Sequence, residues 1–144
     1  MKVELEYVTT EDDEKATLKV REVTENIKSA VDMLENNCRS LSAVKDNETY
    51  MIRTDKIYYV ESVDKRSYVY TKENCYETRY RLYELEEMLN ADYFRCSKAL
   101  IVNIRKIKSV HSELNGRMNA ELLNGETIVI SRSYVKDLKR KLGL

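Results

Sequence analysis

The chain has 144 residues, of which 42% are hydrophobic, and its 25 Lys and Arg balance its 25 Asp and Glu. This composition predicts one ordinary core, while a charged N-terminus and the lack of any run of 18 apolar residues argue against a signal peptide or membrane insertion, so we expect a cytoplasmic protein. Three widely spaced cysteines and a single histidine, His111, predict no disulfide framework, no metal site and no cofactor.

The first 40 residues are acidic and predict a separate β-β-α extension. They hold six Lys and Arg against ten Asp and Glu, so the remainder carries a net charge of +4. Residues 3–8 and 16–23 alternate apolar and polar side chains, as half-buried strands do. Apolar side chains then recur at helical spacing, which predicts a helix over residues 24–37. We interpret residues 1–40 as a dimerisation or signal-input element, and 41–144 as the domain that faces a polyanion.

Residues 41–144 predict a mainly β domain made of small antiparallel sheets. Short segments rich in Tyr, Val and Ile are separated by polar pairs, and one segment, residues 81–90, has helical spacing instead. The predicted strands are 41–45, 49–54, 56–63, 66–71, 76–82, 106–113, 117–123 and 126–131. Asn115-Gly116 and Asn124-Gly125 predict two-residue hairpin turns, because Asn-Gly allows positive φ at both central positions. Ser133 and Gly143 are predicted to cap a basic helix over residues 133–143.

The segment from Arg95 to Lys108 carries five cationic residues and no Asp or Glu. Leu100, Ile101 and Val102 lie in its middle, and we expect them to anchor the segment by packing in the core. The cations on both sides would then project outward, where they could neutralise the backbone of a DNA duplex. A charge run beside a buried strand is also compatible with a merely solvated face.

Three sequence words in this domain together resemble the LytTR family of bacterial DNA-binding domains. They are YYVES at residues 58–62, FRCSKALIVN at 94–103 and ISRSYVKDLK at 130–139. The resemblance extends from Met51 to the C-terminus. It implies an elongated arrangement of small antiparallel sheets in which loops enter successive major grooves of double-stranded DNA. It therefore implies a sequence-specific transcription regulator and no enzyme.

The resemblance also implies where DNA would be contacted. Base-reading positions of the family fall on the 62–68 hairpin, on the basic segment and on the Ser131-Arg132 word. The predicted DNA-binding residues are Lys65, Arg66, Ser67, Arg95, Ser97, Lys98, Asn103, Arg105, Lys106, Lys108 and Arg132. Ser97 stands where many members have histidine, and Ala99 where many have serine, so the preferred DNA sequence is expected to differ.

Other interpretations remain open at this point. The basic face could bind an acidic protein partner, with the 24–37 helix binding another copy. Arg132 could form a salt bridge with Asp137 instead of reading a base, and Cys96 could be either a buried thiol or a reactive one beside the DNA. The family further implies homodimers on repeated half-sites. It also suggests a stand-alone, response regulator-like protein whose input comes from a separate membrane-protein partner.

Overall fold

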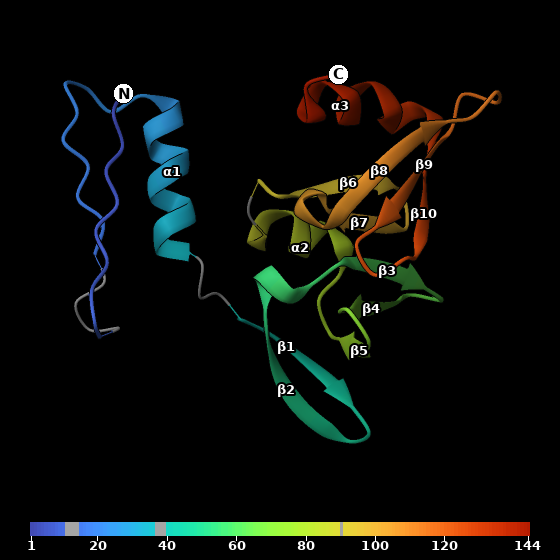
Figure 1. The fold of residues 1–144 in the computed structure, drawn as a ribbon. Coiled ribbons are helices and arrows are strands. Elements are labelled where there is room, and N and C mark those ends of the chain that lie inside the picture. Colours follow the sequence, from blue (N-terminus) through green and yellow to red (C-terminus); the bar gives the residue numbers. More distant parts are fainter. Residues whose placement is uncertain (11–14, 37–39, 90) are drawn as a thin grey trace. The chain divides into compact units, whose positions relative to one another are not determined.

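A computed structural model describes residues 1–10, 15–36, 40–89 and 91–144. The chain divides into two compact units, Met1–Asn37 and Cys38–Leu144, and each is described here by itself (Figure 1). Cys38 lies outside the described residues. None of the helices in the described ranges is both long and apolar enough to span a bilayer.

The first unit contains one helix, α1, which spans Glu25–Asn36. Thr24 begins it, since its Oγ1 accepts a hydrogen bond from the backbone N of Ile27 at 3.3 Å. The two strands predicted at residues 3–8 and 16–23 are wrong, because the described residues of both ranges are assigned no strand. Alternation favours a strand only where one face can be buried. Here the apolar positions are exposed, as Leu5 at 88% illustrates.

The second unit contains a seven-stranded antiparallel sheet in the order β2-β1-β5-β4-β3-β7-β6. Its strands are β1 (Ser40–Lys45), β2 (Glu48–Arg53), β3 (Tyr59–Val63), β4 (Arg66–Tyr70), β5 (Cys75–Thr78), β6 (Tyr93–Ser97) and β7 (Leu100–Asn103). The 3-10 turn η2 (Thr54–Lys56) and the helix α2 (Leu82–Met88) lie between strands of this sheet, and a second 3-10 turn, η3 (Ile104–Lys106), follows β7. These elements confirm the strands and the short helix predicted from sequence.

A three-stranded sheet follows, in the order β10-β9-β8. It consists of β8 (Ile107–Ser112), β9 (Met118–Leu122) and β10 (Thr127–Ile130), and the helix α3 (Arg132–Leu142) ends the chain. Leu138 of α3 is fully buried, and Gly143 ends the helix with a left-handed φ of 76°. The helix begins one residue earlier than predicted. Ser131 occupies its N-cap position, and Arg132 belongs to the first turn.

The turns of the hairpins differ from the prediction. Only the glycines of the two Asn-Gly pairs have positive φ, and the backbone pairs Glu113 N with Arg117 O at 2.8 Å, which leaves a three-residue loop. Such loops combine a type I turn with one left-handed residue, so glycine is needed at a single position. Positive φ at two successive residues occurs instead at Asp46-Asn47 and Asp64-Lys65, which form two-residue turns.

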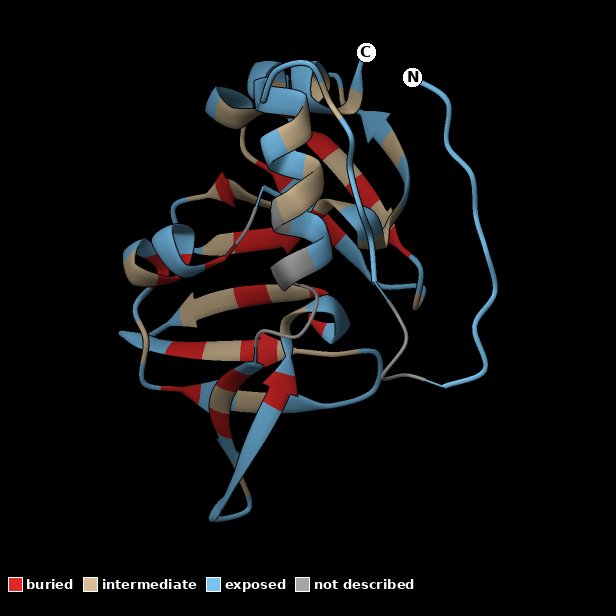
Figure 2. Cartoon of the chain, turned by 90° about the vertical axis from the view of Figure 1, so that its left-hand side faces the viewer, coloured by how far each residue is buried: buried red, intermediate tan, exposed pale blue. Residues whose placement is uncertain are grey.

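Two hydrophobic cores lie within this unit, and β7 contributes to both. Ile101 packs in the core that includes Val60, Val69 and Leu85, whereas Val102 packs in the core that includes Leu138. Successive side chains of a strand point to opposite faces, so a four-residue strand can join two cores. Figure 2 shows this burial along the central strands and the exposure of the β1–β2 hairpin tip. The predicted anchoring role of the apolar segment in the basic stretch is confirmed.

Candidate nucleic-acid interface

Three turns that are far apart in sequence lie side by side at one edge of the second unit. The backbone N of Ser62, near the β3–β4 turn, donates to Ala99 O in the β6–β7 turn at 2.7 Å. The backbone N of Ser131, at the start of α3, donates to Cys96 O at the end of β6 at 2.9 Å. The β6–β7 turn is therefore held between the other two, and Figure 1 shows the end of β3 and the start of α3 on the same side of the unit.

Four exposed cations project from these turns: Lys65, Arg66, Lys98 and Arg132. We call this set the loop edge. Lys65 and Arg66 follow the tight β3–β4 turn, where Lys65 has a left-handed φ of 64°. Arg66 lies 3.9 Å from Glu77 across the neighbouring strand, a distance at which an exposed ion pair contributes little. The loop edge thus presents positive charge on fixed backbone positions.

The stem of the Arg132 side chain is held by a close contact, although the residue is exposed. An ideal Cβ built on Gly116 would lie 2.8 Å from Arg132 Cδ, so the side-chain stem runs closely over the β8–β9 turn. The salt bridge to Asp137 that the sequence left open does not form, because Asp137 pairs with Arg140 at 3.6 Å. No carboxylate within the described ranges is paired with Arg132. A guanidinium that is held in place and has no ion pair to break can bind a bidentate acceptor directly.

Arg95 holds the backbone of the β6–β7 turn. Its Nε donates to Ser97 O at 2.8 Å, its Nη2 donates to Lys98 O, and its Nη1 lies 2.6 Å from Glu86 Oε1 on α2. These bonds use the guanidinium to hold the backbone of the β6–β7 turn. In this structure Arg95 thus fixes the turn that carries Lys98, and its contact with DNA stays a prediction.

Ser67 and Asn103, two of the residues predicted to contact DNA, are buried in this structure, with exposures of 3% and 2%. Ser67 lies on β4, opposite Ser62 on one side and Thr78 on the other, in the middle of the sheet. Asn103 Nδ2 donates to Ile57 O at 2.9 Å, and its Oδ1 accepts from the backbone N of Arg105 at 3.1 Å. A buried polar side chain needs hydrogen-bond partners, and both ends of the Asn103 amide have one. Asn103 therefore has a structural role.

Ser97 is half-buried at the end of β6, and its Oγ accepts a hydrogen bond from the backbone N of Ala99 at 3.2 Å. This bond closes the β6–β7 turn beside Lys98. A serine hydroxyl still has one donor to offer when its oxygen accepts a single bond. Ser97 therefore remains compatible with a contact near the duplex while it also shapes the turn.

The cations after β7 do not belong to the loop edge. Arg105 lies 2.9 Å from Asp92, Lys108 lies 3.7 Å from Glu121, and the Lys106 ammonium lies 5.2 Å from the centre of the Tyr58 ring. The four residues of β7 separate these side chains from Lys98 by roughly 13 Å at the usual rise of a strand. The strand thus places the cations on its two sides at different sites of the unit.

Cys96 is fully buried, although it stands between Arg95 and Ser97 in sequence. The β6–β7 register shifts between those two neighbours, and this bulge turns the thiol into the core, where Sγ lies 3.4 Å from Leu100 O. Burial raises the pKa of the Cys96 thiol to about 12. The thiol is consequently protonated at neutral pH, which contradicts the reactive alternative and confirms burial.

Two tyrosines on neighbouring strands have a structural role. Tyr59 and Tyr70 stack across β3 and β4 with ring centroids 4.3 Å apart, and burial raises the pKa of both hydroxyls. Such cross-strand packing is a common role of tyrosines on neighbouring strands. In the described part of the chain, no group of three or more His, Cys, Asp or Glu side chains is arranged to hold a metal ion.

Sequence reasoning missed a second group of cations. Arg53, Lys56 and Lys72 come from different segments, and together with Lys106 they line one pocket. None of the three belongs to a basic run or a motif in the sequence. What they share is their position around the same pocket, which only the structure shows. Sequence reasoning also missed Gly116 as the support for Arg132, since the contact joins the β8–β9 turn to α3.

Comparisons with known proteins agree with this geometry. The profile of the LytTr DNA-binding domain matches residues 47–143. A transcriptional regulatory protein LytR of Staphylococcus aureus is 31% identical over 137 residues, which cover 91% of this chain and 56% of that protein. The sensory transduction protein LytT of Enterococcus faecalis is 29% identical over 100 residues, covering 69% of this chain and 41% of LytT. The chain thus spans about half the length of these relatives.

Two further relatives match over nearly their whole length. An uncharacterized HTH-type transcriptional regulator of Staphylococcus aureus is 25% identical over 146 residues, which cover 100% of this chain and 99% of that protein. A solved LytTr DNA-binding domain from Bacillus cereus superposes with a TM-score of 0.70 at 27% identity, covering 74% of this chain and 98% of that domain. With a matching profile over most of its length and this shared fold, the chain belongs to the LytTR family of DNA-binding domains.

Proposed function

We propose that this protein is a transcription regulator that binds double-stranded DNA in a sequence-specific way through its loop edge. One observation carries the proposal. Main-chain hydrogen bonds from Ser62 to Ala99 and from Ser131 to Cys96 join three distant turns, and those turns present exposed cations in a chain that matches the LytTr profile. Side chains on a rigid backbone can be placed in register with a groove, which loosely held lysines cannot.

Within this proposal the cations have different roles. Arg132 reads a base, because its supported guanidinium suits a bidentate contact with guanine O6 and N7 in the major groove. Lys98, held by the turn that Arg95 fixes, and the pair Lys65 and Arg66 contact a base edge or the adjacent phosphates. Arg105, Lys106 and Lys108 lie at the opposite end of β7, so we leave them out of the base-reading set.

The experiment that tests the proposal begins with selection of bound duplexes from a random pool, using the whole chain. Affinity for the selected site and for random duplex is then measured with Arg132→Ala at several salt concentrations. The expected loss is about 1–3 kcal/mol on the selected site, with relaxed preference at one base position. Lys108→Ala, whose side chain is paired with Glu121 on β9, is the matched control and should leave discrimination between the two duplexes unchanged.

Two results would count against this function. Equal losses on selected and random duplex for Arg132→Ala, with a salt slope reduced by about one, would mean that Arg132 contacts only phosphate. A failure to enrich any duplex, with binding to an acidic protein instead, would favour the alternative of a protein-interaction module whose basic face binds an acidic partner.

We further propose a homodimer on repeated half-sites, acting in the cytoplasm, with residues 1–40 as the element that pairs two copies or receives a signal. Support comes from α1 and the residues just before it: Ile27, Ala30 and Val31 are half-buried, while Val23, which precedes the helix, and Leu34 are 63% and 55% exposed. Signal input through a separate membrane-protein partner rests on family resemblance alone. Truncation at residue 40 followed by sedimentation tests the pairing: an unchanged oligomeric state in the truncated chain would exclude it.

A further inference from the structure

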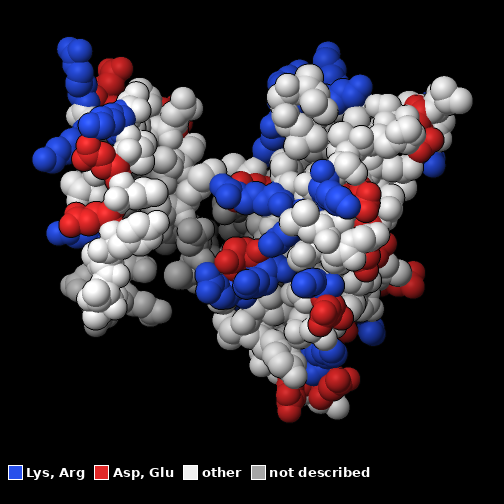
Figure 3. All heavy atoms as spheres, viewed as in Figure 1, with Lys and Arg blue, Asp and Glu red and all other residues white. Residues whose placement is uncertain are grey.

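A second group of cations lines a pocket away from the loop edge. The pocket has a volume of 660 Å³, and its lining includes Arg53, Lys56, Lys72 and Lys106, with Glu73 as its one carboxylate. We call it the basic pocket. The volume falls within the range of small-molecule sites. Lys and Arg side chains also gather on the middle of the visible face of this unit in Figure 3.

The backbone around the basic pocket is held by hydrogen bonds. Ile57 O, beside Lys56, accepts from Asn103 Nδ2 at 2.9 Å, and the backbone N of Tyr58 donates to Tyr70 O at 2.7 Å. Lys72 O accepts from Asn124 Nδ2 at 3.3 Å, which ties the β4–β5 turn to the β9–β10 turn. Fixed backbone beneath exposed side-chain ends is the arrangement that a preformed binding site requires.

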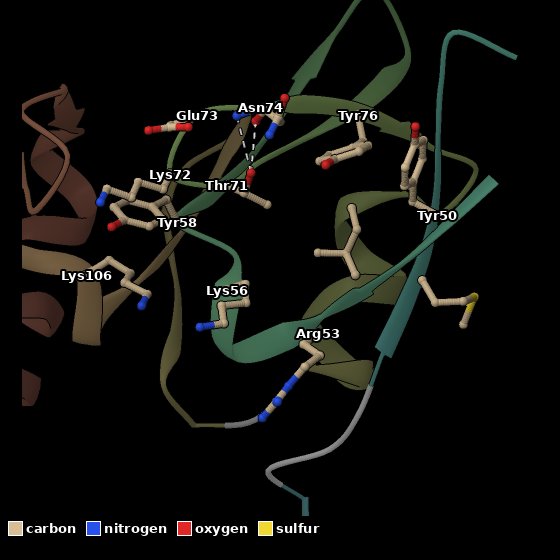
Figure 4. A pocket seen from close by; sticks show the side chains of 12 residues that line it. Tyr50, Arg53, Lys56, Tyr58, Thr71, Lys72, Glu73, Asn74, Tyr76 and Lys106 are labelled. Atoms are coloured by element: carbon tan, nitrogen blue, oxygen red, sulfur yellow. Dashed lines mark hydrogen bonds between the residues drawn. The ribbon is translucent and has the colours of Figure 1, made fainter. Parts of the chain in front are cut away.

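The charges in the basic pocket are only partly compensated. Arg53 lies 3.2 Å from Asp55, and the Lys106 ammonium lies over the Tyr58 ring. Lys56 and Lys72 are exposed, and no carboxylate among the described residues pairs with either of them. In Figure 4 the amines of Lys56 and Lys106 point toward one another across the open space. Cations that converge in this way repel each other and favour an anion between them.

Aromatic side chains form the other end of the basic pocket. Tyr50 and Tyr76 have ring centroids 5.3 Å apart, and Figure 4 shows both rings on the side away from Lys72 and Lys106. Lys45 reaches the far ring, with its ammonium 5.8 Å from the centre of Tyr76. A planar ring of a ligand could pack on these tyrosines while an anionic group is held by the lysines.

The basic pocket and the loop edge lie at opposite ends of the same hairpin. Lys56 and Tyr58 precede β3 and Thr71 follows β4, whereas Lys65 lies in the turn between these strands and Arg66 begins β4. The five residues of β3 span about 15 Å at the usual rise per residue. A ligand in the pocket therefore does not need to occupy the surface proposed to read DNA, and the inference does not depend on that function.

We propose that the basic pocket binds a phosphorylated small molecule with a planar ring, of the nucleotide class. The phosphates lie between Lys56, Lys72 and Lys106, and the ring packs against Tyr50 and Tyr76. The phosphates of such a molecule carry several negative charges that the lysines can bind. Its planar ring can stack on the tyrosines.

The test uses the whole chain, with ATP and inorganic triphosphate as probes, titrated by calorimetry without divalent cations. We expect ATP to bind and triphosphate to bind more weakly, because it lacks the ring. The double variant Lys56→Gln/Lys106→Gln should weaken ATP binding at least about tenfold, since it removes two charge-assisted contacts. Lys136→Gln, which removes an exposed lysine of α3 outside the pocket, is the matched control and should change ATP binding less than twofold.

Three outcomes would overturn the inference. The first is no measurable binding of ATP to the wild-type chain. The second is equal ATP affinity in the wild type and the double lysine variant, which would place the nucleotide elsewhere. The third is unchanged ATP binding together with a loss of duplex affinity in the double variant, which would make the pocket part of the DNA interface. Lys56 and Lys136 are exposed and Lys106 is half-buried, so thermal unfolding checks that all variants remain folded.

Discussion

Replacement of Asn103 by alanine tests whether this residue supports the fold instead of contacting DNA. The Asn103 amide joins two segments, since Nδ2 donates to Ile57 O at 2.9 Å and Oδ1 accepts from Arg105 N at 3.1 Å. Ile57 has no exposure, so its carbonyl oxygen would lose this partner without gaining water. An unsatisfied buried group of this kind costs about 1–3 kcal/mol, and the hydrogen bond lost near the surface costs about 0.5–1.5 kcal/mol more.

We therefore expect Asn103→Ala to lower the free energy of unfolding by about 1.5–4.5 kcal/mol. Urea denaturation followed by circular dichroism measures this change, with the slope of the transition checked for two-state behaviour. Asn119→Ala is the matched control, because Asn119 is half-buried and its amide donates one side-chain bond, to Glu113 at 2.7 Å. Its cost should stay below about 1.5 kcal/mol.

Duplex affinity separates the two roles of Asn103. Under conditions where the variant is folded, Asn103→Ala should bind the selected duplex within about threefold of the wild type, because the side chain does not reach the surface. An unfolding free energy within about 0.5 kcal/mol of the wild type, combined with a tenfold loss of specific affinity, would refute the structural role.

The other predictions concern the loop edge and Cys96. Gly116→Ala should weaken specific duplex binding more than Gly125→Ala does in the same gel-shift assay: both have positive φ, but only at Gly116 would the new Cβ meet Arg132, at 2.8 Å from its Cδ. Equal effects would show that Gly116 does not support Arg132. A bulky thiol reagent at neutral pH should label Cys75, which is exposed, and spare Cys96, as peptide mass spectrometry can measure. Rapid labelling of Cys96 would contradict its burial. Because burial raises the pKa of Cys96 from 9.0 to about 12, the folded state retains this proton longer than the unfolded chain does. The stability that Cys96 contributes is thus complete below pH 9 and falls as the pH rises toward 12, so Cys96→Ala should flatten this decline in urea titrations; an unchanged pH slope would exclude the effect.

Local patterns in the sequence were sufficient to predict most elements of the second unit. Strand alternation and helical spacing depend on side chains a few residues apart, and the apolar segment from Leu100 to Val102 was anchored as expected. The same reasoning failed for residues 3–8 and 16–23. Alternation there implies one buried face, but the apolar side chains of those ranges are exposed except for Val20, which is only half-buried, so they do not form a core.

The site was predictable in its parts but not in its arrangement. The words around Lys98 and Arg132 identified the family and the turns of the loop edge, because these residues follow recognisable strand and helix boundaries. Asn103 ends the same motif as Lys98, and Ser67 lies in the predicted 62–68 hairpin, yet both are buried. Burial of a polar residue depends on which strands pair beside it, and that pairing joins segments separated by dozens of residues.

What the sequence by itself determined was the family, the order of strands and helices, and the concentration of positive charge in residues 41–144. Only the tertiary structure decided how that charge is divided. β7 separates Lys98 from Lys106, Arg95 is used to hold a turn, and the segments that carry Arg53, Lys56 and Lys72 meet Lys106 in a pocket. The physical reason is that electrostatic and hydrogen-bond energies depend on distance in space, and strand pairing brings together residues that no sequence window contains.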